Sequence, residues 1–255
     1  MREIVLNGLE KDFRSNEAYK NLRTNIEFSG EENKVLVFTS CTPNEGKSTV
    51  SLSVASSLAE SGKKVLFIDA DLRKSVLAGR HRVQGELKGL SHFLSGRAKV
   101  EDVVCKTQIE GLMVIFAGII PPNPAELLGQ ERFGNLISSG RKVYDYIIID
   151  APPLGSVIDS AIIARVCDAS VLVISANAIS HKFARVVKEQ LERSECPILG
   201  VVLNKVDMSQ NKYYGKYYGK YGRHYGRYEE GKAPPVNDVS GARIKNDTTA
   251  QSQDT

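Results

Sequence analysis

The sequence lacks long hydrophobic runs, paired cysteines and tryptophan, and the first two absences each exclude a class of structure. The longest stretch without a charged residue is 111–125, and it contains three prolines, among them Pro121 and Pro122. A transmembrane helix needs about 20 apolar residues, so none is expected, and the charged start MREIVLNGLEKDFR does not predict a signal peptide. The four cysteines form no CxxC pair, which excludes a metal knuckle and predicts reduced core thiols in a cytosolic protein.

A large excess of charge is also absent. The 255 residues carry a net charge of +4, and 42% of them are hydrophobic, which is enough for a sizeable core. From residue 209 onward, eight Lys and Arg stand against five Asp and Glu, so this tail carries +3 and leaves +1 for the preceding body. A nearly neutral body predicts no nucleic-acid partner, and any such affinity would have to come from the tail.

The tail, residues 209–255, contains no leucine and a single isoleucine, so it has little with which to build a core. We therefore expect a folded domain over 1–208 and a flexible tail after it. Short Tyr-Tyr-Gly-Lys and Tyr-Gly-Arg units repeat over 213–228 and make that segment low in complexity. Seven of the ten tyrosines lie there, namely Tyr213, Tyr214, Tyr217, Tyr218, Tyr221, Tyr225 and Tyr228.

The body alternates short apolar runs with helix-type segments. The runs predict strands at 35–38, 65–68, 113–116, 146–149, 170–175 and 198–203, and most are continuous, as in parallel strands that are buried on both faces. Helices are predicted at 15–28, 48–60, 125–137, 160–166 and 180–195, with Ser15 or Asn16 capping the first. This pattern predicts an α/β fold, a doubly wound and mostly parallel sheet with helices on both faces.

A phosphate-binding loop is predicted where VLVFTS runs into CTPNEGKSTV and then a helix. Such a loop directs backbone N–H groups and a helix N-terminus at phosphate oxygens. Lys47 would neutralise the β- and γ-phosphates, and the Ser48 hydroxyl would ligate Mg²⁺. Cys41 replaces the first glycine of the strict GxxxxGK[ST] motif. The predicted nucleotide contacts are Asn44, Glu45, Gly46, Lys47, Ser48 and Thr49.

Two further predicted strands end in carboxylates, at Asp69, Asp71 and Asp150. Ligands of an open α/β sheet lie at the carboxyl ends of its strands, so these acids indicate a cation site beside the phosphate loop. We expect Asp69 to take a proton from an attacking hydroxyl and Asp71 and Asp150 to hold or orient Mg²⁺. The alternative is that Asp69 or Asp150 caps a turn. Arg73 is a candidate phosphate contact or an exposed arginine, and Asn204 a candidate adenine contact or part of an ordinary turn.

Together, FTSCTPNEGKST, VLFIDADLRK, PPNPAELL, YDYIIIDAPP and the tyrosine-rich tail closely resemble the bacterial protein-tyrosine kinases of capsule and exopolysaccharide synthesis. The match covers about 13–228 and is of the Gram-positive type, a separate cytoplasmic catalytic chain. The resemblance implies a P-loop NTPase fold, ATP and Mg²⁺ as cofactors, and autophosphorylation of the tyrosine cluster in trans. It also implies a separate transmembrane activator, which would hold the chain at the inner face of the membrane, and a cognate phosphotyrosine phosphatase.

The resemblance also assigns site residues. It places Lys47 and Ser48 on ATP and Mg²⁺, Thr49 on the α-phosphate, Asp69 and Asp71 in a second Walker-type motif, and Asp150 in Walker B. Glu17, Lys20 and Arg23 resemble the family's ExxRxxR motif, which implies a ring-like homo-oligomer, an octamer. Lys20 stands where the motif has arginine and keeps the charge but loses bidentate pairing. Without the resemblance, this pattern is typical of a solvated helix face.

Two other functions compete with a tyrosine kinase. A ParA- or MinD-like positioning ATPase resembles the same superfamily, but its signature lysine in KGGxGK aligns with Thr42 here. A nucleic-acid-binding ATPase would use the basic tail, with tyrosines stacking on bases. The tail suits a kinase substrate, because a flexible, glycine-rich and basic segment would be drawn to an acidic, phosphate-bearing site. An aggregation-prone end is the remaining interpretation of that segment.

Overall fold

The structure, a computed structural model, describes residues 1–9, 12–83, 85 and 87–207. Contacts divide the chain into Met1–Asp207 and Met208–Thr255, and the described residues all belong to the first unit. The tyrosine cluster predicted as a substrate, 213–228, lies outside the described residues, as does the rest of the predicted tail.

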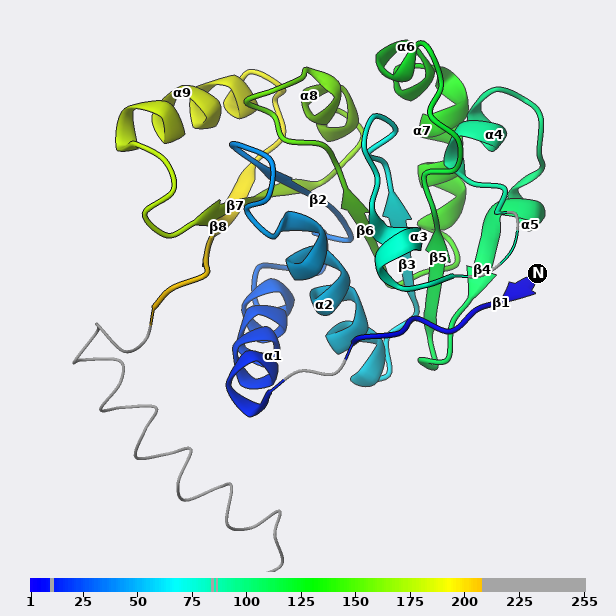
Figure 1. Ribbon diagram of the computed structural model, residues 1–255, viewed down its shortest axis with the longest axis horizontal. Coiled ribbons are helices and arrows are strands. Elements are labelled where there is room, and N and C mark those ends of the chain that lie inside the picture. The colour runs from blue at the N-terminus through cyan, green and yellow to red at the C-terminus, as the bar shows by residue number, and fades with distance from the viewer. Residues whose placement is uncertain (10–11, 84, 86, 208–255) are drawn as a thin grey trace, which may run out of the picture. The chain divides into compact units, whose positions relative to one another are not determined.

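Within the described residues, an eight-stranded sheet has the order β1-β4-β5-β3-β6-β2-β7-β8 (Figure 1). The strands are β1 (Arg2–Glu3), β2 (Val35–Ser40), β3 (Val65–Asp69), β4 (Val104–Lys106), β5 (Leu112–Ile115), β6 (Tyr146–Asp150), β7 (Ala169–Ser175) and β8 (Ile198–Asn204). Neighbouring strands are parallel except for β4 and β5. The prediction of a mostly parallel α/β sheet is confirmed.

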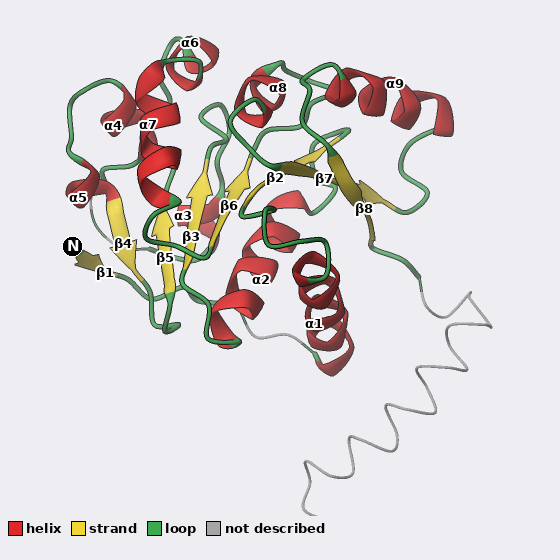
Figure 2. Cartoon of the chain, turned by 180° about the vertical axis from the view of Figure 1, so that it is seen from behind, coloured by secondary structure: helices red, strands yellow, loops and turns green. Residues whose placement is uncertain are grey.

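Helices cover both faces of this sheet (Figure 2). They are α1 (Phe13–Glu27), α2 (Lys47–Glu60), α3 (Leu77–Arg80), α4 (Leu90–Leu94), α5 (Val100–Val103), α6 (Pro124–Leu128), α7 (Glu131–Gly140), α8 (Asp159–Ala164) and α9 (His181–Glu192). The prediction of a doubly wound arrangement is therefore also confirmed.

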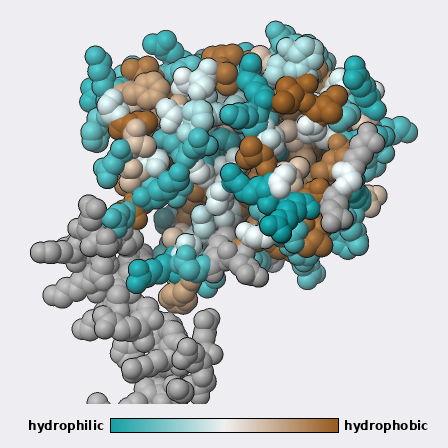
Figure 3. Space-filling view, viewed as in Figure 1, coloured by the Kyte–Doolittle hydropathy of each residue, from teal (hydrophilic) through white to brown (hydrophobic). Residues whose placement is uncertain are grey.

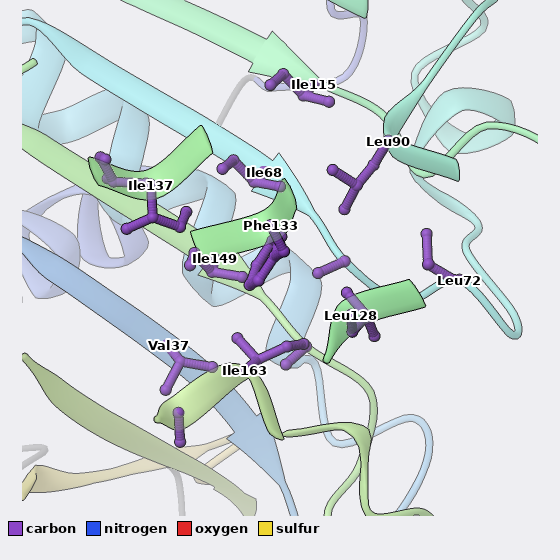
Figure 4. Packing of buried hydrophobic residues seen from close by; sticks show 14 of the residues in the cluster. Val37, Ile68, Leu72, Leu90, Ile115, Leu128, Phe133, Ile137, Ile149 and Ile163 are labelled. Atoms are coloured by element: carbon purple, nitrogen blue, oxygen red, sulfur yellow. The ribbon is translucent and has the colours of Figure 1, made fainter. Parts of the chain in front are cut away.

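Each face of the sheet has its own hydrophobic core, because successive side chains of a strand point to opposite faces. In β2, Val35 and Val37 join the core under α6 to α9, whereas Leu36 and Phe38 join the core under α1 and α2. Figure 4 shows Phe133 of α7 packed among isoleucines of the central strands. Both cores hold the central strands rigidly, which fixes the loops at their carboxyl ends.

Two helix predictions needed correction. α1 begins earlier than predicted, because Asp12 caps it and accepts hydrogen bonds from the N–H groups of Arg14 and Ser15, so neither Ser15 nor Asn16 is the cap. The segment predicted as one helix over 125–137 forms α6 and α7, because Gln130 is extended at ψ 150° and interrupts it. The short elements β1, β4 and α3 to α5 were not predicted from the sequence.

On the face that Figure 3 shows, hydrophobic residues form small patches among hydrophilic ones. No helix in the part of the chain that the structure describes is long and apolar enough to cross a membrane. The cysteines in this part, Cys41, Cys105, Cys167 and Cys196, are all free, as expected.

Candidate active site

The predicted phosphate loop lies at the carboxyl end of β2 and leads directly into α2. Gly46 occupies the N-cap of α2 in the left-handed region, with φ 89°, and no side chain caps the helix. A Cβ at this position would lie 2.1 Å from the Asn204 side-chain nitrogen, so a larger residue would displace the Asn204 amide in addition to straining the left-handed backbone. The N–H groups of the first turn of α2 therefore receive no side-chain cap, and this arrangement suits an anionic ligand.

Lys47, the first residue of α2, makes a buried ion pair with Asp150 at the end of β6. The distance from Lys47 Nζ to Asp150 Oδ1 is 2.7 Å, and the two side chains are 6% and 1% exposed. Lys47 Nζ also donates to Ser48 Oγ at 3.2 Å, and Ser51 Oγ donates to Asp150 Oδ1 at 3.1 Å. The structure thus brings the predicted Lys47, Ser48 and Asp150 together, and it adds Ser51, which no sequence motif indicated.

Asp69 lies beside Asp150, because β3 and β6 are neighbours and pair these two residues in register. Asp69 is fully buried, and the Ser75 hydroxyl hydrogen bonds to its carboxylate. Burial, reinforced by the negative charge of Asp150, raises the pKa of Asp69 to about 7. A carboxyl group with this pKa can exchange protons near neutral pH, as a general base requires.

The two polar residues after β3 already have partners within the chain. Asp71 Oδ1 accepts hydrogen bonds from the backbone N–H groups of Arg73 and Lys74 at 3.3 and 3.0 Å, as a turn-capping residue does. The Arg73 guanidinium makes two hydrogen bonds of 2.8 Å to the buried carboxylate of Asp159. Arg73 therefore contributes to the packing of α8 in this structure, and the metal role predicted for Asp71 stays a prediction.

The remaining loop residues tie the phosphate loop to β7 and β8. Glu45 is buried and accepts hydrogen bonds from the N–H groups of Thr42 at 2.7 Å and Ser175 at 3.2 Å. Asn204 Nδ2 donates to the Glu45 carbonyl at 2.9 Å, and Lys205 Nζ donates to the Asn44 carbonyl at 2.6 Å. These contacts hold the loop in shape, and Lys205 was not anticipated from the sequence. The predicted contact of Asn204 with adenine remains a prediction.

Thr49, one helical position beyond Ser48, has a different environment. Its hydroxyl accepts a hydrogen bond from Arg80 Nη1 at 2.9 Å. Arg80 ends the short helix α3, and no motif in the sequence marked it.

The predicted oligomerisation residues occupy two settings on α1. Lys20 and Glu17 form an exposed ion pair at 2.8 Å. Arg23 instead turns toward α2, where Nη1 donates to the Ser57 carbonyl at 3.0 Å, and its Nε lies 3.9 Å from a Glu27 carboxylate oxygen. Arg23 thus supports the packing of α1 on α2, whereas Glu17 and Lys20 are available to another molecule.

The residues of the loop fit a nucleotide with its metal. Asp150 Oδ2 is buried and has no hydrogen-bond partner among the described residues, which is costly unless a cation or water satisfies it. No group of three or more His, Cys, Asp or Glu within residues 1–9, 12–83, 85 and 87–207 is arranged to hold a metal by itself. Magnesium bound here would therefore take part of its ligands from phosphate oxygens and water, as is usual for Mg²⁺.

Comparison with known proteins shows the family of this chain. Residues 34–193 match the family model described as AAA domain. The chain is 46% identical over 211 residues to "Tyrosine-protein kinase CpsD" of Streptococcus agalactiae, and the match covers 83% of this chain and 92% of that protein.

Solved structures agree with the sequence comparison. The kinase domain of the Escherichia coli tyrosine kinase ETK superposes with a TM-score of 0.70 at 35% identity, over 75% of this chain and 77% of that one. The septum site-determining protein MinD of Pyrococcus horikoshii, solved with Mg-ADP, superposes with a TM-score of 0.60 at 26% identity, over 69% of this chain and 72% of that one. The predicted resemblance and the predicted enzyme class are therefore confirmed, and the chain belongs to the family of bacterial tyrosine-protein kinases.

Proposed function

We propose that this chain uses Mg²⁺-ATP to phosphorylate the tyrosines of its own tail, 213–228, in trans within a ring-like oligomer, an octamer. The phosphoryl transfer would regulate capsule or exopolysaccharide synthesis and export. The observation that carries the proposal is the buried Lys47–Asp150 pair at the uncapped N-terminus of α2. Membership of the bacterial tyrosine-protein kinase family supports phosphoryl transfer from ATP to tyrosine as the reaction at this site.

Each residue of the site then has a part. Lys47 would leave Asp150 to contact the β- and γ-phosphates, and Ser48 with Asp150 would hold Mg²⁺, which offsets phosphate charge during the transfer. Asp69 would accept the proton of the attacking tyrosine hydroxyl, because its raised pKa matches that task. The phenol oxygen forms a bond to the γ-phosphorus as the bond between that phosphorus and the leaving ADP oxygen breaks.

Partners and location belong to the same proposal. We propose that a separate transmembrane protein activates the chain and holds it in the cytoplasm at the inner face of the membrane, and that a phosphotyrosine phosphatase reverses the reaction. Phosphate adds about −1.5 to −2 charge per tyrosine, so modification of several tyrosines would reverse the +3 charge of the tail. A tail held by an acidic site would then be released.

The proposal is tested by incubating purified protein with labelled ATP, Mg²⁺ and an activator segment, followed by mapping of phosphotyrosine by mass spectrometry. Wild type should acquire label on the tail. Labelling of Lys47→Met should be at least about 100-fold lower than labelling of wild type, because the lysine acts on the transferred group. Circular dichroism should show that this variant remains folded. Replacing all seven tail tyrosines by Phe should remove the label and preserve nucleotide binding.

Other outcomes identify the competing functions. ATP hydrolysis without labelling, with and without activator, would favour a positioning ATPase of the MinD type. Label that moves to Tyr19, Tyr144 or Tyr146 at the original rate would exclude the tail as substrate. These three tyrosines are only partly exposed, and burial raises the pKa of each phenol, so they are poor nucleophiles. Loss of DNA affinity on tail truncation would favour the nucleic-acid-binding ATPase.

A further inference from the structure

Arg80 lies next to the phosphate loop although it is far from it in sequence. Its Nη1 donates to Thr49 Oγ1 at 2.9 Å, and Thr49 stands in the first turn of α2, two residues after Lys47. Both residues line a cavity that continues along α1 and α2 past Ser15, Tyr19 and Leu52. The guanidinium therefore has open space on the side of α2 that faces the cavity.

The backbone that carries Arg80 is well anchored. Leu77, which begins α3, is buried in the core with α2. The next residue, His81, is also buried, and its carbonyl accepts hydrogen bonds from the backbone N–H of Asn7 at 3.4 Å and from the Asn7 side-chain amide at 3.0 Å. Anchors on both sides keep the exposed Arg80 side chain near α2.

The charge of Arg80 is not offset by a carboxylate of the described residues, unlike the charges of Arg73 and Arg141. Arg73 pairs with Asp159 and Arg141 with Asp168, each at 2.8 Å. Within the described ranges, no carboxylate lies at ion-pair distance from Arg80, and its hydrogen bond is to a neutral hydroxyl. Its positive charge adds to the potential of the α2 N-terminus, where anions are favoured.

We propose that Arg80 is a nucleotide-binding residue, which contacts the α-phosphate together with Thr49. The inference rests on the proposed function, because the ligand is the nucleotide of the same loop. A guanidinium presents several donors in a fixed fork and suits phosphate oxygens better than a lysine does. Arg80 would act on the side of α2 away from Asp150, so its contribution does not depend on the metal.

Equilibrium binding of fluorescent ATP and ADP analogues tests this role without relying on catalysis. Arg80→Ala should weaken the binding of both nucleotides by the same factor, about ten-fold, with and without Mg²⁺, because both carry the α-phosphate. Arg80→Lys should recover part of the affinity. The control is Arg97→Ala, which removes the same charge from an exposed position between α4 and α5 and should bind like wild type.

The outcomes separate this inference from the proposed function. Lys47→Met serves as the second arm. If wild type binds nucleotide, Lys47→Met does not, and Arg80→Ala binds like wild type, the role of Arg80 is overturned while the phosphate loop stands. A loss confined to ATP, or to Mg²⁺-containing samples, would also overturn the α-phosphate assignment. If wild type binds neither nucleotide, both proposals fail.

Discussion

At the scale of single residues, the raised pKa of Asp69 makes the stability of the protein depend on pH. Its pKa of about 7 compares with 3.8 for the unperturbed side chain, so the folded protein keeps a proton that the unfolded chain releases. Stability attributable to this group is complete below about pH 4 and is lost as the pH rises toward 7. The Lys47 ammonium opposes the effect, because it favours the charged carboxylate.

We therefore predict that nucleotide-free wild type loses more stability between pH 5 and pH 8 than Asp69→Asn does, since asparagine carries no titrating proton. Urea unfolding followed by circular dichroism at the two pH values measures the difference. Glu110→Gln, a change at an exposed acid, should behave like wild type and serves as the control. Parallel pH dependences for wild type and Asp69→Asn would show that Asp69 is ionised throughout.

The same residue sets the expected pH profile of tyrosine labelling. Ionised Asp69 is the form that accepts a proton, so the rate should rise through about pH 7 and level off above it.

At the scale of elements, the start of the phosphate loop depends on the loop after β6. A Cβ on Gly155 would lie 2.2 Å from the Cys41 carbonyl oxygen, a backbone atom that cannot move without shifting the phosphate loop. Gly155 thus fixes how closely the β6 loop approaches the end of β2.

Gly155→Ala should therefore destabilise the fold by about 1–3 kcal/mol and weaken nucleotide binding, because the overpacked loop must shift. Thermal unfolding and binding of the fluorescent ATP analogue measure the two effects. The matched control is Gly200→Ala in β8, where an added Cβ would meet nothing within 4 Å. Equal behaviour of the two variants would mean that the phosphate loop tolerates the displacement.

Elements were predictable from sequence to the extent that their signals were local. The apolar runs located β2, β3, β5, β6, β7 and β8, although β8 lies at the edge of the sheet and is not buried, and GKST located the start of α2. The break between α6 and α7 was missed because Gln130 has no breaking signal of its own.

The site residues were also predictable only where their signals were local. Asp150 ends β6, and Lys47 and Ser48 begin the helix after β2, whereas Arg80 and Lys205 reach the loop from distant segments through tertiary contacts alone.

At the scale of the whole molecule, assembly should depend on the outward part of α1. Glu17 and Lys20 contact each other and solvent, whereas Arg23 is partly occupied by the Ser57 carbonyl. An exposed ion pair contributes about 0–1 kcal/mol to the stability of a monomer. Removing Glu17 and Lys20 should therefore affect an interface more than the fold.

Replacing Glu17, Lys20 and Arg23 together by Ala should lower the oligomer mass measured by light scattering, because the change removes the charged face that the proposed ring uses. The control removes another exposed ion pair, Lys188 and Glu192 on α9, and should leave the mass unchanged. An unchanged mass for the α1 variant would exclude this helix from the interface. A variant with Arg23 retained separates loss of assembly from loosened packing of α1 on α2.

The four buried or half-buried cysteines have a practical consequence for labelling chemistry. Burial raises the pKa of every one of these thiols, to about 12 for Cys41 and about 11 for Cys196, so little thiolate is present at neutral pH. Maleimide and similar reagents attack the thiolate, and they should therefore spare the native cysteines. One cysteine introduced at an exposed position such as Glu110 would then accept a fluorophore selectively, and assembly could be followed spectroscopically without first removing any native thiol.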